Sequence, residues 1–403
     1  PSGDLTTSPR RRIVIRREIA RLRQGDAFEK RMACELDRAY QYAAIDTCAT
    51  DGLCSTACPV DIDTGKLMKY FRSTKHTDRE KLLADWCADH FGLITHGLRF
   101  VLTAAEQIRN AAGGERWDRW LAGIRKATDG FLPGWNRYMP GGAFSGIPET
   151  SGSAADSDVI FFPSCLSRTM GNLPGEVHSL STSEAFFAVL DRAGIPYRLP
   201  GNLNKLCCGT PWSSKGFPDT FRKMAERMTA ALWTATDQGR IPVVTDTSPC
   251  SYTMLHYDEI LTGESLRRWR ALQIYDIIEY LHDAILPKLT LRQIPGIVVC
   301  HPTCSTVKME QSAMLLSIAQ QCSEQAVIPQ NHGCCGFAGD RGLLYPELTE
   351  SATRMQAEEI RALRGNIKGY YSTSRTCEVG MSSATDRPYS SIIYLVERAS
   401  RPV

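Results

Sequence analysis

The sequence predicts an α/β protein in which helical segments precede two similar lobes, each built around a small parallel sheet. In its second half, short apolar runs of the kind that form buried strands alternate with stretches of helical periodicity. The strand candidates lie at 159–162, 242–245 and 297–299, and two of the helices are expected at 219–233 and 348–363. Because strands that alternate with helices favour parallel pairing, ligands are expected on the loops at the strand ends.

The cysteines of the second half repeat in register, which predicts an internal duplication. In both copies an apolar run is followed by Pro-x-Cys, then by Cys-Cys-Gly and a last Cys, and the interval from Cys-Cys-Gly to the last Cys has the same length. The cysteines are Cys165, Cys207, Cys208 and Cys250 in the first copy, and Cys304, Cys334, Cys335 and Cys377 in the second. We therefore expect two lobes, at 156–290 and 291–403, related by a pseudo-twofold axis.

Length and composition are those of a globular protein of more than one domain. The chain has 403 residues, of which 43% are hydrophobic and 23% charged, with a net charge of +3. This near-neutral charge argues against nucleic acid as a partner. No stretch approaches the ~20 apolar residues that a membrane-spanning helix needs.

The pattern of cysteines favours metal or redox chemistry over a disulphide framework. No export signal opens the sequence, and adjacent cysteines are poor disulphide partners for each other. We therefore expect a cytoplasmic protein, with a peripheral position on the inner face of the membrane as an alternative. The first residue is Pro1 rather than Met, so either the start has been processed or, as we favour, this is a segment of a longer polypeptide.

Residues 1–75 combine helical periodicity with a first cysteine cluster. Cys48, Cys54 and Cys58, followed by Pro59, match the Cys-x2-Cys-x2-Cys-x3-Cys-Pro pattern with which bacterial ferredoxins bind a 4Fe-4S cluster. Asp51 stands where the second cysteine belongs. Its carboxylate is expected either to bind iron more weakly than a thiolate or to leave a site for three irons. The segment is thus a partial ferredoxin-type domain, without the paired upstream motif.

Each copy of the duplicated motif gathers four thiols, enough to hold one iron–sulphur cluster. Two adjacent cysteines fit a single tetrahedral ion poorly, but they can bind two irons of one cluster, or one can point inward while the other takes part in redox chemistry. Gly209 and Gly336 are expected at positive φ, where their turns let backbone amides face the sulphurs. Thiols at all eleven positions of the three motifs are therefore candidate ligands.

The other cysteines and two histidines are given more ordinary roles. Cys34, Cys87 and Cys322 lie outside the motifs on helical segments and are expected to be small buried apolar residues. Cys300 is either a spare ligand or a strand residue. His301 and His332 lie close to motif cysteines in sequence, so either could approach a cluster, but surface or hydrogen-bonded positions are favoured for both.

At these residues the chain resembles known redox families. The duplicated motif is similar to the CCG domains of heterodisulfide reductase and of the iron–sulphur subunit of anaerobic glycerol-3-phosphate dehydrogenase. A closer resemblance is to the C-terminal half of FAD-linked, cytochrome- or quinone-dependent D-lactate dehydrogenases. It covers nearly the whole chain and is carried by the segments 5–17, 47–65, 135–140, 301–305, 333–339 and 373–378.

The D-lactate dehydrogenase resemblance implies a division of labour within a longer chain. A flavin domain N-terminal to Pro1 would oxidise a 2-hydroxy acid with FAD, and 4Fe-4S-type clusters bound by the motif cysteines would pass the electrons to a cytochrome or quinone. No G-x-G-x-x-G loop follows a strand, so FAD is not expected to bind to these residues. No catalytic residue is identified.

The resemblance is incomplete at one point, and other interpretations stay open. Thr247 and Ser374 stand where heterodisulfide reductase has the first cysteine of a terminal Cys-x2-Cys, so a hydroxyl or four thiolates must complete each site. A heterodisulfide-reductase-like enzyme or a redox protein similar to the glycerol-3-phosphate dehydrogenase subunit is one alternative. A zinc-stabilised, non-enzymatic module is another.

Residues 76–155 are expected to form a helical insert and a linker. Aromatic and apolar residues recur at helical spacing to about residue 140, and the polar run 149–155 is the linker candidate. The aromatic residues at its end are Trp117, Trp120, Phe131 and Trp135. We expect them to pack between domains, with an amphipathic contact to the flavin domain or a membrane surface as the alternative.

Overall fold

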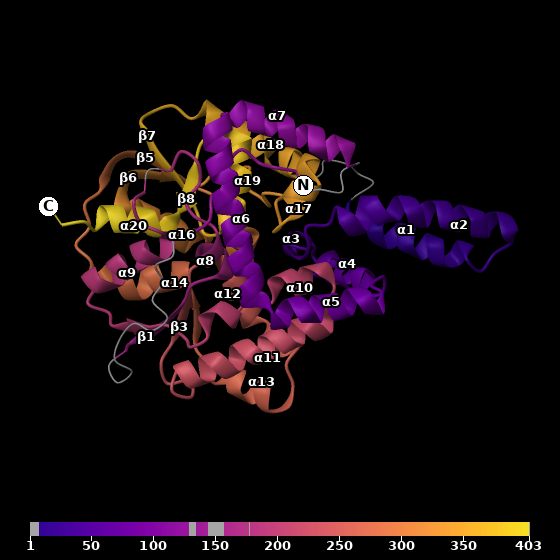
Figure 1. The fold of residues 1–403 in the computed structure, drawn as a ribbon, viewed down its shortest axis with the longest axis horizontal. Helices are drawn as coiled ribbons and strands as arrows, with labels where there is room; N and C mark the ends of the chain where they lie inside the picture. The colour runs from indigo at the N-terminus through magenta and orange to yellow at the C-terminus, as the bar shows by residue number, and fades with distance from the viewer. Residues whose placement is uncertain (1–7, 129–133, 144–156, 177, 403) are drawn as a thin grey trace.

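Helices precede two α/β lobes in the computed structural model of the chain, as predicted (Figure 1). The structure describes residues 8–128, 134–143, 157–176 and 178–402. The first two helices, α1 (Pro9–Leu22) and α2 (Ala27–Tyr40), form a hairpin that projects from the body of the molecule. Pro9 is the first residue of α1 and Ser8 precedes it, although the Ser8 hydroxyl makes no capping hydrogen bond.

Two four-stranded parallel sheets with the same strand order form the lobes. The first sheet has the order β2-β1-β3-β4, and the second has the order β6-β5-β7-β8. The strands are β1 (Val159–Phe162), β2 (Tyr197–Arg198), β3 (Val243–Thr245), β4 (Ile274–Asp276), β5 (Ile294–Cys300), β6 (Ser323–Val327), β7 (Ile367–Ser372) and β8 (Tyr389–Ser391). All six strand pairs are parallel, so the predicted duplication and sheet type are confirmed.

Helices cover both sheets. In the first lobe they are α8 (Cys165–Thr169), α9 (Thr182–Arg192), α10 (Thr210–Lys215), α11 (Pro218–Ala235), α12 (Ser248–Leu255), α13 (Gly263–Arg270) and α14 (Ile277–Tyr280), with single turns at Leu203–Lys205, Tyr257–Glu259, Leu281–Ile285 and Leu286–Lys288. In the second lobe they are α15 (Cys304–Lys308), α16 (Ser312–Cys322), α17 (Arg341–Leu344), α18 (Pro346–Ala362), α19 (Arg375–Thr385) and α20 (Ile392–Ala399). The helices predicted at 219–233 and 348–363 are thus α11 and α18.

The two lobes exchange helix contacts reciprocally. Helix α9 of the first lobe packs against α20 of the second, while α16 of the second packs against α14 and the turn Leu281–Ile285 of the first. One apolar cluster includes fully buried side chains of both sheets, among them Ile160 and Val298. Because a buried aliphatic side chain contributes about 1.5–3 kcal/mol, this shared core holds the lobes in a fixed relation.

The remaining N-terminal helices lie along both lobes. They are a π-helical turn at Gln41–Asp46, followed by α3 (Leu53–Thr56), α4 (Thr64–Ser73), α5 (Asp78–Asp89), α6 (Phe91–Ala112) and α7 (Gly114–Ala127). Helices α4 and α5 contact α10 and α11 of the first lobe, whereas α3 contacts α15 of the second. The Arg72 side chain on α4 donates to the carbonyls of Ile45 (2.6 Å) and Cys48 (2.7 Å) and so fixes the first cysteine loop.

The aromatic residues of the insert divide between core and surface. Trp117 is buried and packs against Trp135 with ring centroids 5.7 Å apart, as expected for a packing role. Trp120 is 58% exposed, so the prediction that it packs between domains is wrong, because it faces outward from α7. Phe131 and the linker candidate 149–155 lie outside the described residues.

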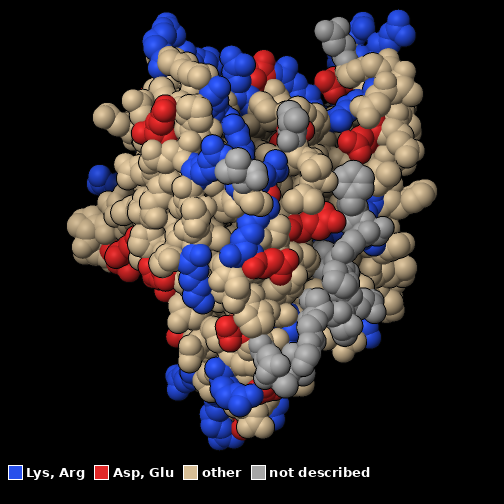
Figure 2. Space-filling view, turned by 90° about the vertical axis from the view of Figure 1, so that its left-hand side faces the viewer, with Lys and Arg blue, Asp and Glu red and all other residues tan. Residues whose placement is uncertain are grey.

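Charges on the surface are mixed. On the face in Figure 2, Lys and Arg side chains are interspersed with Asp and Glu. No helix among the described residues is long and apolar enough to cross a membrane.

Candidate metal centres

The four thiols of the first lobe meet where β1 and β3 end. Ser164 caps α8 by accepting a hydrogen bond from the Ser167 amide (3.2 Å), and Cys165 is the first residue of that helix. Its Sγ lies 3.9 Å from Cys207 Sγ. The neighbouring Cys208 Sγ lies 3.2 Å from Cys250 Sγ, so the Cys-Cys pair joins all four thiols.

The second lobe repeats this arrangement. Thr303 caps α15 by accepting from the Thr306 amide (3.1 Å), and Cys304 is again the first helical residue. A hydrogen bond with the Cys334 thiol, together with burial, raises the pKa of Cys304 well above its usual range. Cys335 Sγ lies 3.3 Å from Cys377 Sγ. In both lobes the first thiol therefore pairs with the first cysteine of Cys-Cys-Gly, and the second cysteine pairs with the last thiol.

The glycine of each Cys-Cys-Gly turn is required by the backbone. Gly209 has φ +84° and Gly336 has φ +69°, as predicted. A Cβ at Gly336 would lie 2.7 Å from the Leu348 carbonyl oxygen, and a Cβ at Gly209 would lie 2.6 Å from the Phe221 ring. The Gly336 amide donates to Cys334 Sγ (3.4 Å), which is the amide-to-sulphur contact that the sequence predicts.

Buried thiols and a buried cation set the charge balance of the first lobe. Hydrogen bonds with the thiols of Cys207 and Cys250 hold the pKa of Cys208 well below its usual range. Arg168 is buried beside them and donates to the carbonyls of Leu203 (2.7 Å) and Leu206 (2.6 Å), on the approach to Cys207. This guanidinium both holds the loop and offsets thiolate charge. Sequence reasoning missed Arg168, whose position in the second lobe is taken by Val307.

The hydroxyls that replace the missing cysteines do not face the thiols. Thr247 Oγ1 lies 2.9 Å from Ser164 Oγ and 3.1 Å from Asp246 Oδ1, and it can donate its one proton to either of these oxygens, both within the first lobe. Ser374 Oγ lies 3.2 Å from Thr376 Oγ1. Of the two alternatives for completing each site, these contacts favour thiolates over these hydroxyls.

The N-terminal motif is more open than the lobes. Among the described residues no hydrogen bond joins the thiols of Cys48, Cys54 and Cys58. Cys48 Sγ accepts from the Thr50 amide (3.4 Å), and Cys54 Sγ lies 3.4 Å from Thr64 Oγ1. These three thiols are therefore not gathered as tightly as those of either lobe.

Asp51 lies between the N-terminal motif and the second lobe. Its carboxylate accepts a 3.0 Å hydrogen bond from the Leu53 amide at the start of α3, the helix that contacts α15. Its negative charge adds to the hydrogen bonds and burial that raise the pKa values of Cys304 and Cys334. The N-terminal motif thus faces the thiols of the second lobe.

The sequence left two positions open for His301, and the structure places it beside thiols of the second lobe. It follows β5 and is fully buried. One of its ring nitrogens, Cys335 Sγ and Cys377 Sγ all lie within 4.8 Å of one another. Burial lowers its pKa to about 4. The predicted hydrogen bond does exist, between Nδ1 and Gln356, but it accounts for one ring nitrogen only.

The residues outside the motifs have mixed outcomes. Cys300 is the buried last residue of β5 and Cys322 is buried in the core, whereas Cys87 is only partly buried. Cys34 is exposed, so the prediction of burial is wrong: α2 turns Ala33 inward, and the next residue lies about 100° round the helix. His332 is bonded to the Pro329 carbonyl (2.7 Å), as expected.

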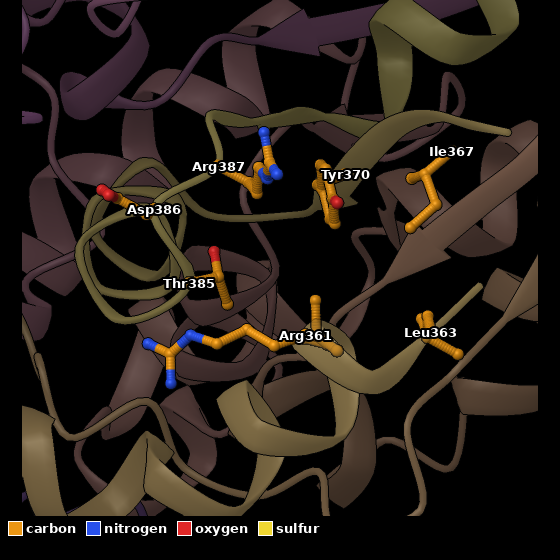
Figure 3. A pocket seen from close by; sticks show the side chains of 8 residues that line it. Arg361, Leu363, Ile367, Tyr370, Thr385, Asp386 and Arg387 are labelled. Carbon is orange, nitrogen blue, oxygen red and sulfur yellow. The ribbon is translucent and has the colours of Figure 1, made fainter. Parts of the chain in front are cut away.

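A surface pocket of the second lobe lies away from all of these groups. It has a volume of about 390 Å³ and is lined by Arg361, Tyr370 and Arg387, among others (Figure 3). Thr385, on its wall, ends α19, whereas Cys377 lies in the first turn of that helix, about 12 Å away along its axis. The pocket takes no part in the metal centres.

The donor sets fit a bound metal cluster. All fifteen cysteines are free, and the paired thiols of 3.2–3.9 Å are far beyond the ~2.05 Å of a disulphide. Four converging thiols, loops at positive φ and an amide directed at sulphur are what iron–sulphur ligation uses.

Comparisons with known proteins agree with this chemistry. The profile of the CCG family, described as "Cysteine-rich domain", matches residues 159–255 and 298–381. The glycolate oxidase iron-sulfur subunit of Escherichia coli K12 is 23% identical over 98% of this chain and 89% of its own length. A subunit of the anaerobic glycerol-3-phosphate dehydrogenase of the same organism is 25% identical over 43% of this chain, which covers 47% of that protein. Lactate utilization protein A of Macrococcus caseolyticus is 22% identical over 38% of the chain, which covers 62% of that protein. The chain therefore carries two copies of the CCG cysteine-rich domain and is related, over nearly its whole length, to an iron–sulphur subunit of an oxidoreductase.

Proposed function

We propose that this chain is the iron–sulphur electron-transfer portion of a flavin-linked dehydrogenase of 2-hydroxy acids, of the D-lactate type. The observation that carries the proposal is the identical pairing of four buried or partly buried thiols in each lobe. The similarity to the glycolate oxidase subunit supports the substrate class, because glycolate and D-lactate are both 2-hydroxy acids. The lactate utilization relative supports the same class.

The ligands are assigned lobe by lobe. Cys165, Cys207, Cys208 and Cys250 would hold one centre, and Cys304, Cys334, Cys335 and Cys377 a second. Cys48, Cys54 and Cys58, with Asp51 at the fourth position, would hold a third, of the 4Fe-4S type or with one iron fewer. Clusters bound at these sites supply one-electron transfer. The protein's part is to bury the thiols, direct amides at sulphur and fix the distances between centres.

The partners follow from the same proposal. FAD would be bound by a flavin domain outside this segment, and a cytochrome or quinone would accept the electrons. A cytoplasmic location, with peripheral contact to the inner face of the membrane, suits transfer to a membrane-bound acceptor. The contact between α3 and α15 supports a short route from the N-terminal motif into the second lobe.

The test begins with the metal. Protein purified without oxygen is expected to be brown, to contain iron and acid-labile sulphide, and to give EPR signals on reduction. Four thiolates around one zinc ion would also lie about 3.8 Å apart. Zinc without iron would therefore reject the proposal in favour of the zinc-stabilised module.

The second step tests the substrate. The complete polypeptide, with its flavin, is mixed anaerobically with D-lactate, L-lactate or glycolate, and cluster reduction is followed by absorbance and EPR. Reduction by D-lactate before the other two is expected. Reduction by none of them, in protein that carries both flavin and clusters, would contradict the assigned substrate class.

A further inference from the structure

We propose that His301 is a ligand of the second-lobe centre, which makes the two lobes chemically unequal. The inference rests on the proposed iron–sulphur function and goes beyond the cysteine assignments. It names a nitrogen donor where the duplicated motif supplies only sulphur.

The position of His301 supports direct ligation. A ring nitrogen, Cys335 Sγ and Cys377 Sγ all lie within 4.8 Å of one another. The side chain is 0% exposed, and Nε2 has no hydrogen-bond partner among the described residues. A buried polar atom without a partner costs about 1–3 kcal/mol. Ligation to a metal removes that cost.

The other ring nitrogen is already arranged for this role. The Gln356 side chain lies against Nδ1, with its amide oxygen at 3.2 Å and its amide nitrogen at 3.1 Å, and it is buried too. Donation from Nδ1–H to the amide oxygen leaves the lone pair on Nε2, the free nitrogen. Ligating histidines are usually held in this way by a second hydrogen bond.

Among the described residues of the first lobe, no histidine lies beside the thiols in this way. His301-Pro302-Thr303-Cys304 occupies the position that Phe162-Pro163-Ser164-Cys165 occupies in the first lobe, so a buried phenyl ring stands where the imidazole lies. A phenylalanine fills the same space and binds no metal. At this position the first lobe therefore has a residue that can only pack, whereas the second lobe has one that can also bind a metal.

The chemical consequence is a difference in reduction potential. Where the neutral imidazole takes the place of one of the four thiolates on the cluster, the centre carries less negative charge, so an added electron is repelled less. The second lobe is then expected to be reduced more easily than it would be with thiolate ligands alone. Electrons would collect there rather than being shared equally between the lobes.

The experiment uses the cluster-loaded protein and two variants. The protein is labelled with 15N-histidine, and the nitrogen coupling of the reduced centres is measured by pulsed EPR. His301→Phe copies the first lobe into the second, and His332→Gln alters a nearby histidine that is bonded to a carbonyl. Redox titration of each protein follows the potentials, and circular dichroism checks that each variant is folded.

We expect a strong histidine nitrogen coupling in the wild type and in His332→Gln, and its loss in His301→Phe together with a change in one centre's potential. Iron–sulphur signals without any histidine coupling in the wild type would overturn the inference and leave the proposed function intact. Since this readout needs no variant, the test stays decisive even if His301→Phe misfolds. Protein without iron and sulphide would instead overturn the proposed function, and this inference with it.

Discussion

Ser248 Oγ donates a 2.8 Å hydrogen bond to Thr373 Oγ1 across the boundary between the two lobes. The Ser248 amide also donates to the Thr373 carbonyl (3.1 Å), and both side chains are buried. Ser248 lies just before Cys250, and Thr373 lies just before Cys377. The segments that lead to the last thiol of each lobe are thus joined to each other by hydrogen bonds.

Removing the side-chain hydrogen bond between Ser248 and Thr373 should lower the stability of the folded protein. Ser248→Ala deletes a buried hydrogen bond and is expected to lower the free energy of unfolding by about 1–2 kcal/mol. Urea denaturation measures the change, and Ser214→Ala, at a partly exposed serine, should change it by less than about 0.5 kcal/mol. Equal effects of the two substitutions would contradict a structural role for the contact.

Cysteines of the two lobes should hold separate centres. Cys208→Ser and Cys335→Ser are each expected to lower the iron and sulphide content by one cluster and to remove a different set of EPR signals. The control is Cys34→Ser, at an exposed thiol, which should retain the full iron content. If either lobe variant kept all its iron, the ligand assignment for that lobe would be wrong.

Two glycine-to-alanine substitutions should have opposite signs. Gly336→Ala forces a Cβ into positive φ and to 2.7 Å from the Leu348 carbonyl oxygen, so a loss of more than about 1 kcal/mol is expected. Gly97 lies within α6, where an added Cβ meets nothing within 4 Å, so Gly97→Ala should add up to about 1 kcal/mol. Thermal unfolding monitored by circular dichroism measures both, and a stabilised Gly336→Ala would refute the strain argument.

Acid should weaken the contact between the lobes at His178. Its ring stacks on Tyr394 with centroids 3.9 Å apart and Nε2 lies 3.1 Å from Ser390 Oγ, while burial lowers its pKa below 6.5. The unfolded chain therefore binds this proton more readily. The contribution to stability is complete above about pH 6.5 and is lost as the pH falls through the folded-state value, by at most ~1.4 kcal/mol per pH unit.

Substitution of His178 shows how much its protonation contributes to the pH dependence of stability. In His178→Phe, stacking on Tyr394 is retained and the free energy of unfolding should depend less steeply on pH below about 6.5. His96→Gln, on an exposed part of α6, should keep the wild-type slope. Denaturation at several pH values makes the comparison, and identical slopes in all three proteins would exclude His178 as the source.

The parts of the molecule that sequence reasoning could predict are those with a local or repeated signal. Strands β1, β3 and β5 are continuous apolar runs, and Gly209 and Gly336 recur after paired cysteines. For His301 the only signal was its place next to Cys300, because its position also depends on Gln356, which is 55 residues away in the sequence. The contacts of Arg168 with its loop and of Asp51 with the second lobe could not be predicted for the same reason. Each contact forms only after the chain has folded. The burial of Cys34 was predicted wrongly because neighbouring residues on a helix point in different directions. Which of them faces the core depends on how α2 is rotated about its axis.

The reciprocal packing of α9 and α20 also constrains the order of events during synthesis. Helix α9 is made long before α20, yet the two cover each other's apolar faces. Until the ribosome has released α20, the first lobe lacks part of its own core and presents apolar surface to the solvent. A chaperone that holds the nascent chain would be needed most in that interval, before iron is delivered.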